Sequence, residues 1–394
     1  MGTAKIAEGV NWVGVLHPDL KVFDIIMPLE NGTTYNSYLV QGEKTAVIES
    51  VRDGFYDEFM DNVKSLTDPA KIDYIIVNHT EPDHSGSMLR LLKDAPDATV
   101  ICSQAASNFL RQIVNEDFDF EIVKDGDTLD LGGGKTLRFI SAPLLHWPDT
   151  MFTYLEEDGV LFSCDAFGSH YSGESMFNDE VGDFSADFKY YFTGIMGPFK
   201  PRVLDAIKKI RGLQINAIAP SHGPILRKAP WKYVDTYEEW CTPQPKEGKD
   251  LLITFASAYG YTGAVAKALK EGAASVPGTR VHFLELGNDG GPVDAAKMLE
   301  TADGLLVGSP TIISNIVEPV MEFLTHINPI IHKGLKASAF GSYGWSGEAV
   351  PMLVERMKTL RLSVVEPGLR VNFNPSDSDL EAAREFGKEF AAGL

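Results

Sequence analysis

Four side chains of metal-binding type lie within residues 79–84. The segment 78–86 reads Asn-His-Thr-Glu-Pro-Asp-His-Ser-Gly and so contains His79, Glu81, Asp83 and His84. It directly follows an apolar run at 72–77, which predicts a buried strand. In an extended loop, residues 79, 81 and 83 project to the same side. Gathering such groups costs desolvation and mutual repulsion unless a cation offsets it, so the pattern predicts a metal site rather than a polar turn.

Three more residues of ligand type stand near the ends of apolar runs. His146 lies beyond a predicted strand at 136–140, Asp165 follows the run 160–164, and His222 follows the run 215–218. Loops at the ends of strands are where folds of this kind place their functional groups. We therefore expect these three residues to join the cluster near position 80.

The C-terminal part of the chain carries a second, independent set of loops. From residue 250 onward, short apolar runs alternate with helical patterns, which predicts a doubly wound parallel sheet. The first run leads into Ser257-x-x-Gly260-x-Thr262 at the start of a helix, where hydroxyls and free backbone N–H groups can bind an anion. This spacing resembles the flavodoxin phosphate loop, which holds the phosphate of FMN.

Two further loops, at 308–314 and 341–347, leave the third and fourth strands of this part. Parallel folds bind ligands at such strand ends, and glycine and aromatic residues there suit a flat ring. The predicted flavin-binding residues are Ser257, Ala258, Tyr259, Gly260, Tyr261, Thr262, Pro310, Thr311, Ile312, Ile313, Ser314, Ser342, Tyr343, Gly344 and Trp345. Another glycine-rich stretch, at 131–135, opens no helix and is predicted to be a hairpin turn.

Together, the two sets of motifs resemble those of flavodiiron proteins over essentially the whole chain. The resemblance implies a metallo-β-lactamase-like αββα sandwich at residues 1–247, followed by a flavodoxin-like FMN domain at 248–394. Metallo-hydrolases of this fold usually have H-x-H-x-D-H, whereas this sequence has Glu81 at the second histidine. A carboxylate in that place favours iron over zinc.

By the same resemblance, His79, Glu81 and His146 hold one iron, and Asp83, His84 and His222 hold the other, with Asp165 bridging. Whether His84 binds iron directly or through a water is left open. His170 and Tyr190 match outer positions of the family that deliver or stabilise protons, although a polar loop histidine and a packed tyrosine are nearly as good interpretations.

The implied activity is reduction of dioxygen to water, of nitric oxide to nitrous oxide, or of both, with electrons relayed through FMN. The sequence does not decide between the two substrates. The resemblance implies a head-to-tail homodimer, with a tetramer left open, and an electron donor such as rubredoxin, because no cysteine-pair module lies within the sequence. Basic residues at 200–211 and 227–232 are a candidate donor surface or, equally, a solvated helix face.

Composition excludes several other classes. The 394 residues carry a formal net charge of −20, which argues against nucleic acid or an anionic membrane as the main partner. No apolar run is long enough for a membrane span, and no signal-peptide pattern opens the chain, so we expect a cytoplasmic protein. Two alternatives remain: a zinc hydrolase of the same fold with a passenger flavodoxin domain, and a flavin electron carrier with a non-catalytic first domain.

Overall fold

The computed structural model describes residues 2–243 and 245–394, and the chain divides into two compact units, Met1–Pro243 and Gln244–Leu394. The linker was predicted at 242–249, a stretch that includes Gln244, which lies outside the described residues. Among the described residues, no helix combines the length and the apolar character that crossing a membrane requires.

Two sheets form the centre of the first unit. The larger has the strand order β1 (Ala4–Ala7), β2 (Val10–Trp12), β7 (Tyr38–Gln41), β8 (Thr45–Ile48), β9 (Tyr74–Val77), β10 (Thr99–Cys102), β11 (Phe120–Ile122). The smaller has the order β12 (Thr128–Asp130), β13 (Thr136–Ser141), β14 (Met151–Leu155), β15 (Val160–Cys164), β16 (Ala217–Pro220). The glycine-rich stretch 131–135 joins β12 to β13 as an antiparallel hairpin, as predicted. Two short ribbons pair β3 (Val15–His17) with β6 (Thr33–Tyr35) and β4 (Val22–Phe23) with β5 (Met27–Pro28).

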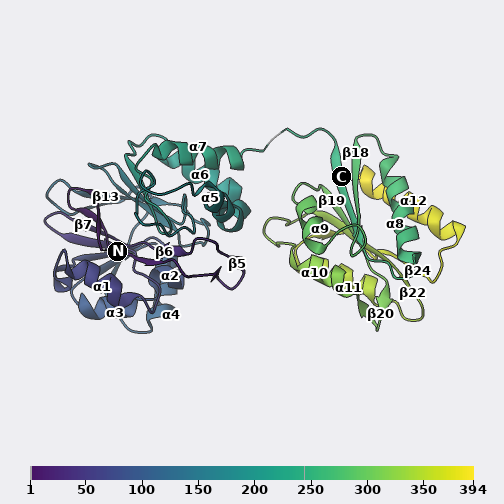
Figure 1. The fold of residues 1–394 in the computed structure, drawn as a ribbon, viewed down its shortest axis with the longest axis horizontal. Coiled ribbons are helices and arrows are strands. Elements are labelled where there is room, and N and C mark those ends of the chain that lie inside the picture. Colours follow the sequence, from purple (N-terminus) through teal and green to yellow (C-terminus); the bar gives the residue numbers. More distant parts are fainter. Residues whose placement is uncertain (1, 244) are drawn as a thin grey trace. The chain divides into compact units, whose positions relative to one another are not determined.

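Helices cover the outer face of each sheet, which gives the four layers of an αββα sandwich (Figure 1). The larger sheet is covered by α1 (Tyr56–Lys64), α3 (Met88–Asp94) and α4 (Gln104–Val114), and the smaller by α5 (Ser185–Tyr191), α6 (Lys200–Ile210) and α7 (Pro230–Cys241). Side chains alternate along the strands, because successive residues point to opposite faces. On β8, Val47 packs with Phe59 of α1, while Ile48 packs with Phe162 of the other sheet. The predicted sandwich is confirmed.

The second unit is a parallel sheet with helices on both faces (Figure 1). Its order is β18 (Thr279–Glu285), β17 (Lys249–Phe255), β19 (Gly304–Gly308), β22 (Lys336–Tyr343), β23 (Ser363–Val364), with β24 (Leu369–Asn372) also on β22. One face packs α8 (Tyr261–Ala274) and α12 (Asp377–Ala392), and the other packs α9 (Pro292–Leu299), α10 (Glu318–Thr325) and α11 (Ala349–Thr359). This is the predicted doubly wound, flavodoxin-like arrangement.

The last strand differs from the prediction. A single strand was expected at 362–366, but β23 and β24 pair with opposite ends of β22 and are separated by residues 365–368, which include Pro367 and Gly368. Proline lacks the N–H that a continuous ladder needs, and Gly368 has a φ of +82°. The break places a second strand end, and the residues after it, beside the loop that follows β22.

Candidate metal centre and flavin cavity

Strand ends from both sheets of the first unit bring seven side chains together. His79, Glu81, Asp83 and His84 follow β9 of the larger sheet. Asp165 and His222 follow β15 and β16 of the smaller sheet, and His146 lies between β13 and β14. These are the seven residues that the sequence predicted as metal ligands, and they form two groups with potential ligand atoms within 4.8 Å of one another.

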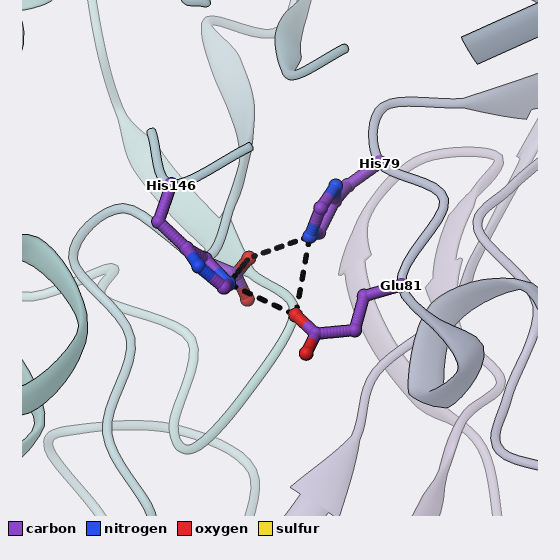
Figure 2. Close-up of side chains that lie close together, drawn as sticks. His79, Glu81 and His146 are labelled. Carbon is purple, nitrogen blue, oxygen red and sulfur yellow. Dashed lines mark hydrogen bonds and ion pairs between the residues drawn. The ribbon is translucent and has the colours of Figure 1, made fainter. Parts of the chain in front are cut away.

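The first group consists of His79, Glu81, His146 and Asp165. Both histidines direct Nε2 at one oxygen of Glu81, at 3.3 Å from His79 and 2.9 Å from His146 (Figure 2). The same two nitrogens each lie 3.7 Å from Asp165 Oδ2. Two imidazole nitrogens and two carboxylates therefore converge on one small space.

The second group consists of Asp83, His84 and His222, and it uses the other oxygen of Asp165. Asp165 Oδ1 lies 3.3 Å from His84 Nε2 and 3.5 Å from His222 Nε2. His222 Nε2 is also 3.1 Å from Asp83 Oδ2. Asp165 thus stands between the two groups, with one carboxylate oxygen toward each.

The chain reaches this arrangement differently from the expected extended loop. Residues Pro82–Ser85 form a short helix, α2, which starts at a proline, a residue well suited to a first helical position. Asp83 and His84 are therefore neighbouring residues of a helix, and their side chains belong to the second group. His79 and Glu81 precede the helix and belong to the first group. The expectation that residues 79, 81 and 83 share one side is wrong, because the helix turns Asp83 away.

In the two ligand groups, the outer nitrogen of each buried histidine also has a polar contact. His79 Nδ1 is hydrogen-bonded to Asp149 Oδ2 at 3.2 Å, and His222 Nδ1 donates to the backbone carbonyl of Thr34 at 2.6 Å. Burial by itself lowers the pKa of His79, but the hydrogen bonds with Asp149 and Glu81 outweigh it and raise that pKa to about 9. The surroundings of His79 therefore favour a positive charge at this imidazole, carried either by a proton or by a bound metal ion.

Several buried polar atoms at the centre lack hydrogen-bond partners among the described residues. They are both carboxylate oxygens of Asp83, the Nε2 atom of His84 and the Nε2 atom of His170. Asp83 lies at ion-pair distance from His84 and His222 but forms no hydrogen bond with either. Buried polar groups are almost always hydrogen-bonded, so this arrangement is costly unless a cation completes it. The donor set fits metal ions that accept both nitrogen and oxygen ligands.

His170 lies against the second group. It is 2% exposed, its Nδ1 is 2.9 Å from Thr33 Oγ1, and its ring centroid is 5.3 Å from that of His222. Burial, with a smaller contribution from the nearby His222, lowers the pKa of His170 to about 3. The imidazole is therefore neutral at physiological pH.

Tyr190 is not brought into the cluster, but its neighbour is. The Tyr190 side chain is 44% exposed, whereas Tyr191 is 1% exposed and its hydroxyl donates to Asp165 Oδ1 at 3.0 Å. Both lie on α5, where consecutive residues point about 100° apart. The apolar spacing of Phe184, Phe188 and Tyr191 marks the buried face of this helix, and that signal selects Tyr191 over Tyr190.

Sequence reasoning also missed two buried carboxylates, Glu49 and Asp149. Glu49 Oε2 lies 3.2 Å from His84 Nδ1, and Asp149 Oδ2 accepts hydrogen bonds from the N–H and the hydroxyl of Thr80, each at 2.8 Å. Asp149 lies three residues after the predicted ligand His146, and Glu49 directly follows the strand β8. Nothing else in the local sequence of either residue distinguishes it from an acidic residue at the surface.

In the second unit, a cavity of about 570 Å³ opens at the carboxyl ends of β17, β19 and β22. Its walls come from the three predicted loops and from Phe373, which follows the unpredicted strand β24. The lining residues are Ala258, Tyr259, Tyr261, Pro310, Thr311, Ile312, Ile313, Ser342, Tyr343, Gly344, Trp345 and Phe373. Of the predicted flavin-binding residues, Ser257, Gly260, Thr262 and Ser314 do not line it.

The loop before α8 has the form of an anion site. Gly260 has a φ of +83°, which other residues rarely adopt, and it allows the chain to turn into the helix at Tyr261. Ser257 Oγ accepts the N–H of Gly263, and Thr262 Oγ1 lies 2.8 Å from Ser342 Oγ. The hydroxyls thus organise the loop around the positive end of the helix.

Between them, two family models match most of the chain. The one described as "ODP family beta lactamase" matches residues 33–223, and the flavodoxin model matches residues 253–387. The first region contains all seven residues of the metal cluster, and the second contains the three loops around the cavity.

Individual proteins are similar over the full length. The flavo-diiron protein FprA2 of Clostridium acetobutylicum is 40% identical, and the match covers 100% of both chains. A nitric oxide reductase of Moorella thermoacetica is 37% identical over 99% of this chain and 98% of that protein. The crystal structure of the Giardia intestinalis flavodiiron protein matches with a TM-score of 0.70 and 30% identity, covering 100% of this chain and 96% of that one. Rubredoxin oxygen:oxidoreductase of Desulfovibrio gigas matches with a TM-score of 0.73 and 27% identity, covering 99% and 98%.

Proposed function

Because this chain belongs to the flavodiiron protein family, we propose that it reduces dioxygen to water, nitric oxide to nitrous oxide, or both, at a pair of iron ions. The protein is an oxidoreductase, and FMN and a di-iron centre are the cofactors of its family. The observation that carries the proposal is the position of Asp165, which presents one oxygen to each of two ligand groups.

The residues divide into two ligand sets in this proposal. His79, Glu81 and His146 hold one iron, Asp83, His84 and His222 hold the other, and Asp165 bridges them. Two iron ions held there supply electrons and open coordination positions for a small diatomic molecule. The chain itself contributes two hard carboxylates beside the bridge, and these favour iron over zinc.

Buried groups next to the second set handle protons in this proposal. His170 is neutral, and its Nε2 atom has no partner among the described residues, so it is free to accept a proton or to orient a water. The Tyr191 hydroxyl directs its proton at Asp165 Oδ1, which stabilises the negative charge of that carboxylate. Reduction of either gas consumes protons, so groups at these positions are needed close to the metals.

The flavin occupies the cavity of the second unit in this proposal. The α8 N-terminus and the loop at 257–262 bind its phosphate, while the loops after β19 and β22 hold the ring. FMN accepts electrons singly or in pairs, which suits transfer from a one-electron donor.

Elemental analysis, together with a visible spectrum, tests the proposal on protein purified without oxygen. We expect two irons and one FMN per chain, and consumption of dioxygen or nitric oxide when reductant is supplied. Asp165→Asn should lose iron and turnover, whereas Asp97→Asn, at an exposed position of the same unit, should retain both. Zinc in place of iron, in cells supplied with iron, would contradict the proposal and favour a hydrolase.

The names of similar proteins suggest the substrates and the electron donor of this chain. The names of two relatives include nitric oxide reduction and rubredoxin-dependent oxygen reduction, so we propose that both gases are substrates and that a rubredoxin-type protein supplies the electrons. Side-by-side turnover of the two gases with reduced rubredoxin tests this.

We also propose that the chain forms the head-to-tail homodimer of the family. Light scattering should give the mass of a dimer. A variant of the interface that loses turnover but keeps both cofactors would support the proposal.

The basic residues considered as a donor surface are largely neutralised. Ion pairs with neighbouring carboxylates involve Arg202, Lys208, Lys209, Arg211 and Arg227. Such surface pairs contribute little stability, but they reduce the positive field that an acidic donor would meet. This supports the solvated-face interpretation, and we expect charge reversal at these positions to change donor turnover little.

A further inference from the structure

Glu49 is a carboxylate buried directly behind the metal cluster. It lies one residue beyond β8, it is 1% exposed, and its φ of +63° turns the chain at the strand end. Its N–H donates to Ile76 O at 2.9 Å, and its carbonyl accepts from Ser37 Oγ at 2.8 Å. The backbone of Glu49 is thus held on both sides by neighbouring strands.

The two carboxylate oxygens of Glu49 face different groups. Oε1 accepts the backbone N–H of Asn78 at 2.5 Å, one residue before His79. Oε2 lies at ion-pair distance from His84 Nδ1, 3.2 Å, and has no hydrogen-bond partner among the described residues. One oxygen therefore anchors the carboxylate, and the other is reserved for the His84 ring.

His84 is held so that its remaining nitrogen faces the centre. An imidazole whose Nδ1 carries the proton toward an acceptor has its lone pair on Nε2. The Nε2 atom of His84 lies 3.3 Å from Asp165 Oδ1 and 3.5 Å from Asp83 Oδ1. The backbone is fixed as well, since the carbonyl of His84 accepts both the N–H and the hydroxyl of Ser50, the residue next to Glu49.

Within the part of the chain that the structure describes, Glu49 is the only carboxylate that faces the outer nitrogen of a histidine in the second ligand group. His222 donates its outer N–H to the neutral carbonyl of Thr34 instead. Cys164 also lies near Glu49 and His84, but its thiol donates a hydrogen bond to Asp165 Oδ2, with a distance of 3.8 Å. The negative charge at this position therefore acts on His84.

We propose that Glu49 is a positioning residue of the di-iron site, which orients His84 for direct coordination through Nε2 and strengthens that imidazole as a ligand. The inference rests on the proposed function, because it needs His84 to be a metal ligand. A carboxylate on the outer nitrogen of a metal-bound histidine fixes the ring and raises its basicity, and loss of such a partner typically costs about 10- to 100-fold in metal affinity.

The test compares Glu49→Gln with the wild-type chain and with Ser37→Ala, which removes a hydrogen bond to the Glu49 backbone but leaves the carboxylate in place. Iron affinity is measured by competition with a chelator, and the reduction potential of the iron pair by spectroscopic titration. We expect Glu49→Gln to bind one of its two irons about 10- to 100-fold more weakly and to show a higher potential, because a negative charge is lost. Ser37→Ala should match the wild type in both.

A double-variant cycle separates action through His84 from a general effect on packing. In a His84→Ala background, Glu49→Gln should cause no further loss of iron affinity, because the residue through which it acts is gone. A further loss of similar size would overturn the proposal, as would equal affinity and potential in Glu49→Gln and the wild type. Should Glu49→Gln fail to fold, Glu49→Asp replaces it. Its shorter carboxylate should also weaken iron binding, and wild-type values would overturn the proposal.

The outcomes distinguish this inference from the proposed function. Absence of iron from the wild-type chain would contradict the function itself. Two irons in the wild type, together with unchanged properties in the Glu49 variants, would contradict only the role of Glu49.

Discussion

The Tyr191 hydroxyl donates a 3.0 Å hydrogen bond to Asp165 Oδ1, the oxygen that also faces His84 and His222. Tyr191 and its exposed neighbour Tyr190 differ by one helical position, so they form a matched pair for mutagenesis.

Tyr191→Phe should reduce turnover by about 10- to 100-fold, since a hydrogen bond to a charged group contributes about 1.5–3 kcal/mol. Steady-state gas consumption, with iron content measured in parallel, checks this. Tyr190→Phe is the control and should retain wild-type turnover. The opposite ranking would show that the exposed tyrosine is the functional one.

Glu81→His should change which metal the first group selects. Glu81 Oε2 is the acceptor shared by His79 and His146, and replacing it with imidazole creates a nitrogen-rich set of the kind that zinc favours. After expression with both metals available, elemental analysis should find more zinc and less iron than in the wild type. An unchanged ratio would mean that Glu81 does not control metal choice.

Asp250→Asn should destabilise the second unit in a pH-dependent way. Arg280 binds both oxygens of Asp250, at 2.8 and 2.9 Å, and holds the pKa of this nearly buried carboxyl well below its usual range, with Lys246 and His282 adding to the effect. A lowered folded-state pKa stabilises the protein above the unfolded-state pKa of about 3.9, and the gain declines as the pH falls below that value.

At pH 7 we therefore expect Asp250→Asn to lose about 1–3 kcal/mol of unfolding free energy. The difference from the wild type should shrink toward pH 3. Urea unfolding followed by flavin fluorescence reports on this unit, with Glu389→Gln as an exposed control. A difference that stays constant with pH would show that the charge of Asp250 is not what stabilises the sheet.

The hairpin of β20 (Thr311–Ile312) and β21 (Asn315–Ile316) should become more stable with a different turn. Its central residues, Ile313 and Ser314, have φ values of +52° and +53°, where Asn-Gly is strongly preferred and a β-branched residue is strained. Replacing the pair with Asn-Gly should raise stability by about 1–2 kcal/mol. FMN should bind more weakly, since Ile313 lines the cavity while being 92% exposed. Thermal unfolding and flavin titration check the two effects.

Local periodicity predicted the doubly wound sheet of the second unit and marked the strand ends whose residues gather at the centre, whereas the αββα sandwich was predicted from the resemblance of the motifs to those of flavodiiron proteins. They did not predict which side chains stand behind the centre. Glu49 and Asp149 are recognisable only once distant strands are packed, since each contacts a histidine that is remote in sequence. The tyrosine that contacts Asp165 is Tyr191, one helical position after the predicted Tyr190, and the sequence pattern did not separate the two. β24 was missed because Pro367 and Gly368 end the apolar run before it.

The two sheets of the sandwich are separate hydrogen-bonded layers, and the seven clustered side chains come from both. In the proposed site, each iron would have ligands from both layers, with His79 and His146 at one iron and His84 and His222 at the other, so the two ions would link the two sheets. Since binding free energy at such a site is also folding free energy, iron removal should loosen this edge and expose its loops to proteases. In this proposal the metal centre also acts as a structural cross-link between the two sheets. Iron limitation in the cell should therefore lower the amount of intact protein as well as its activity.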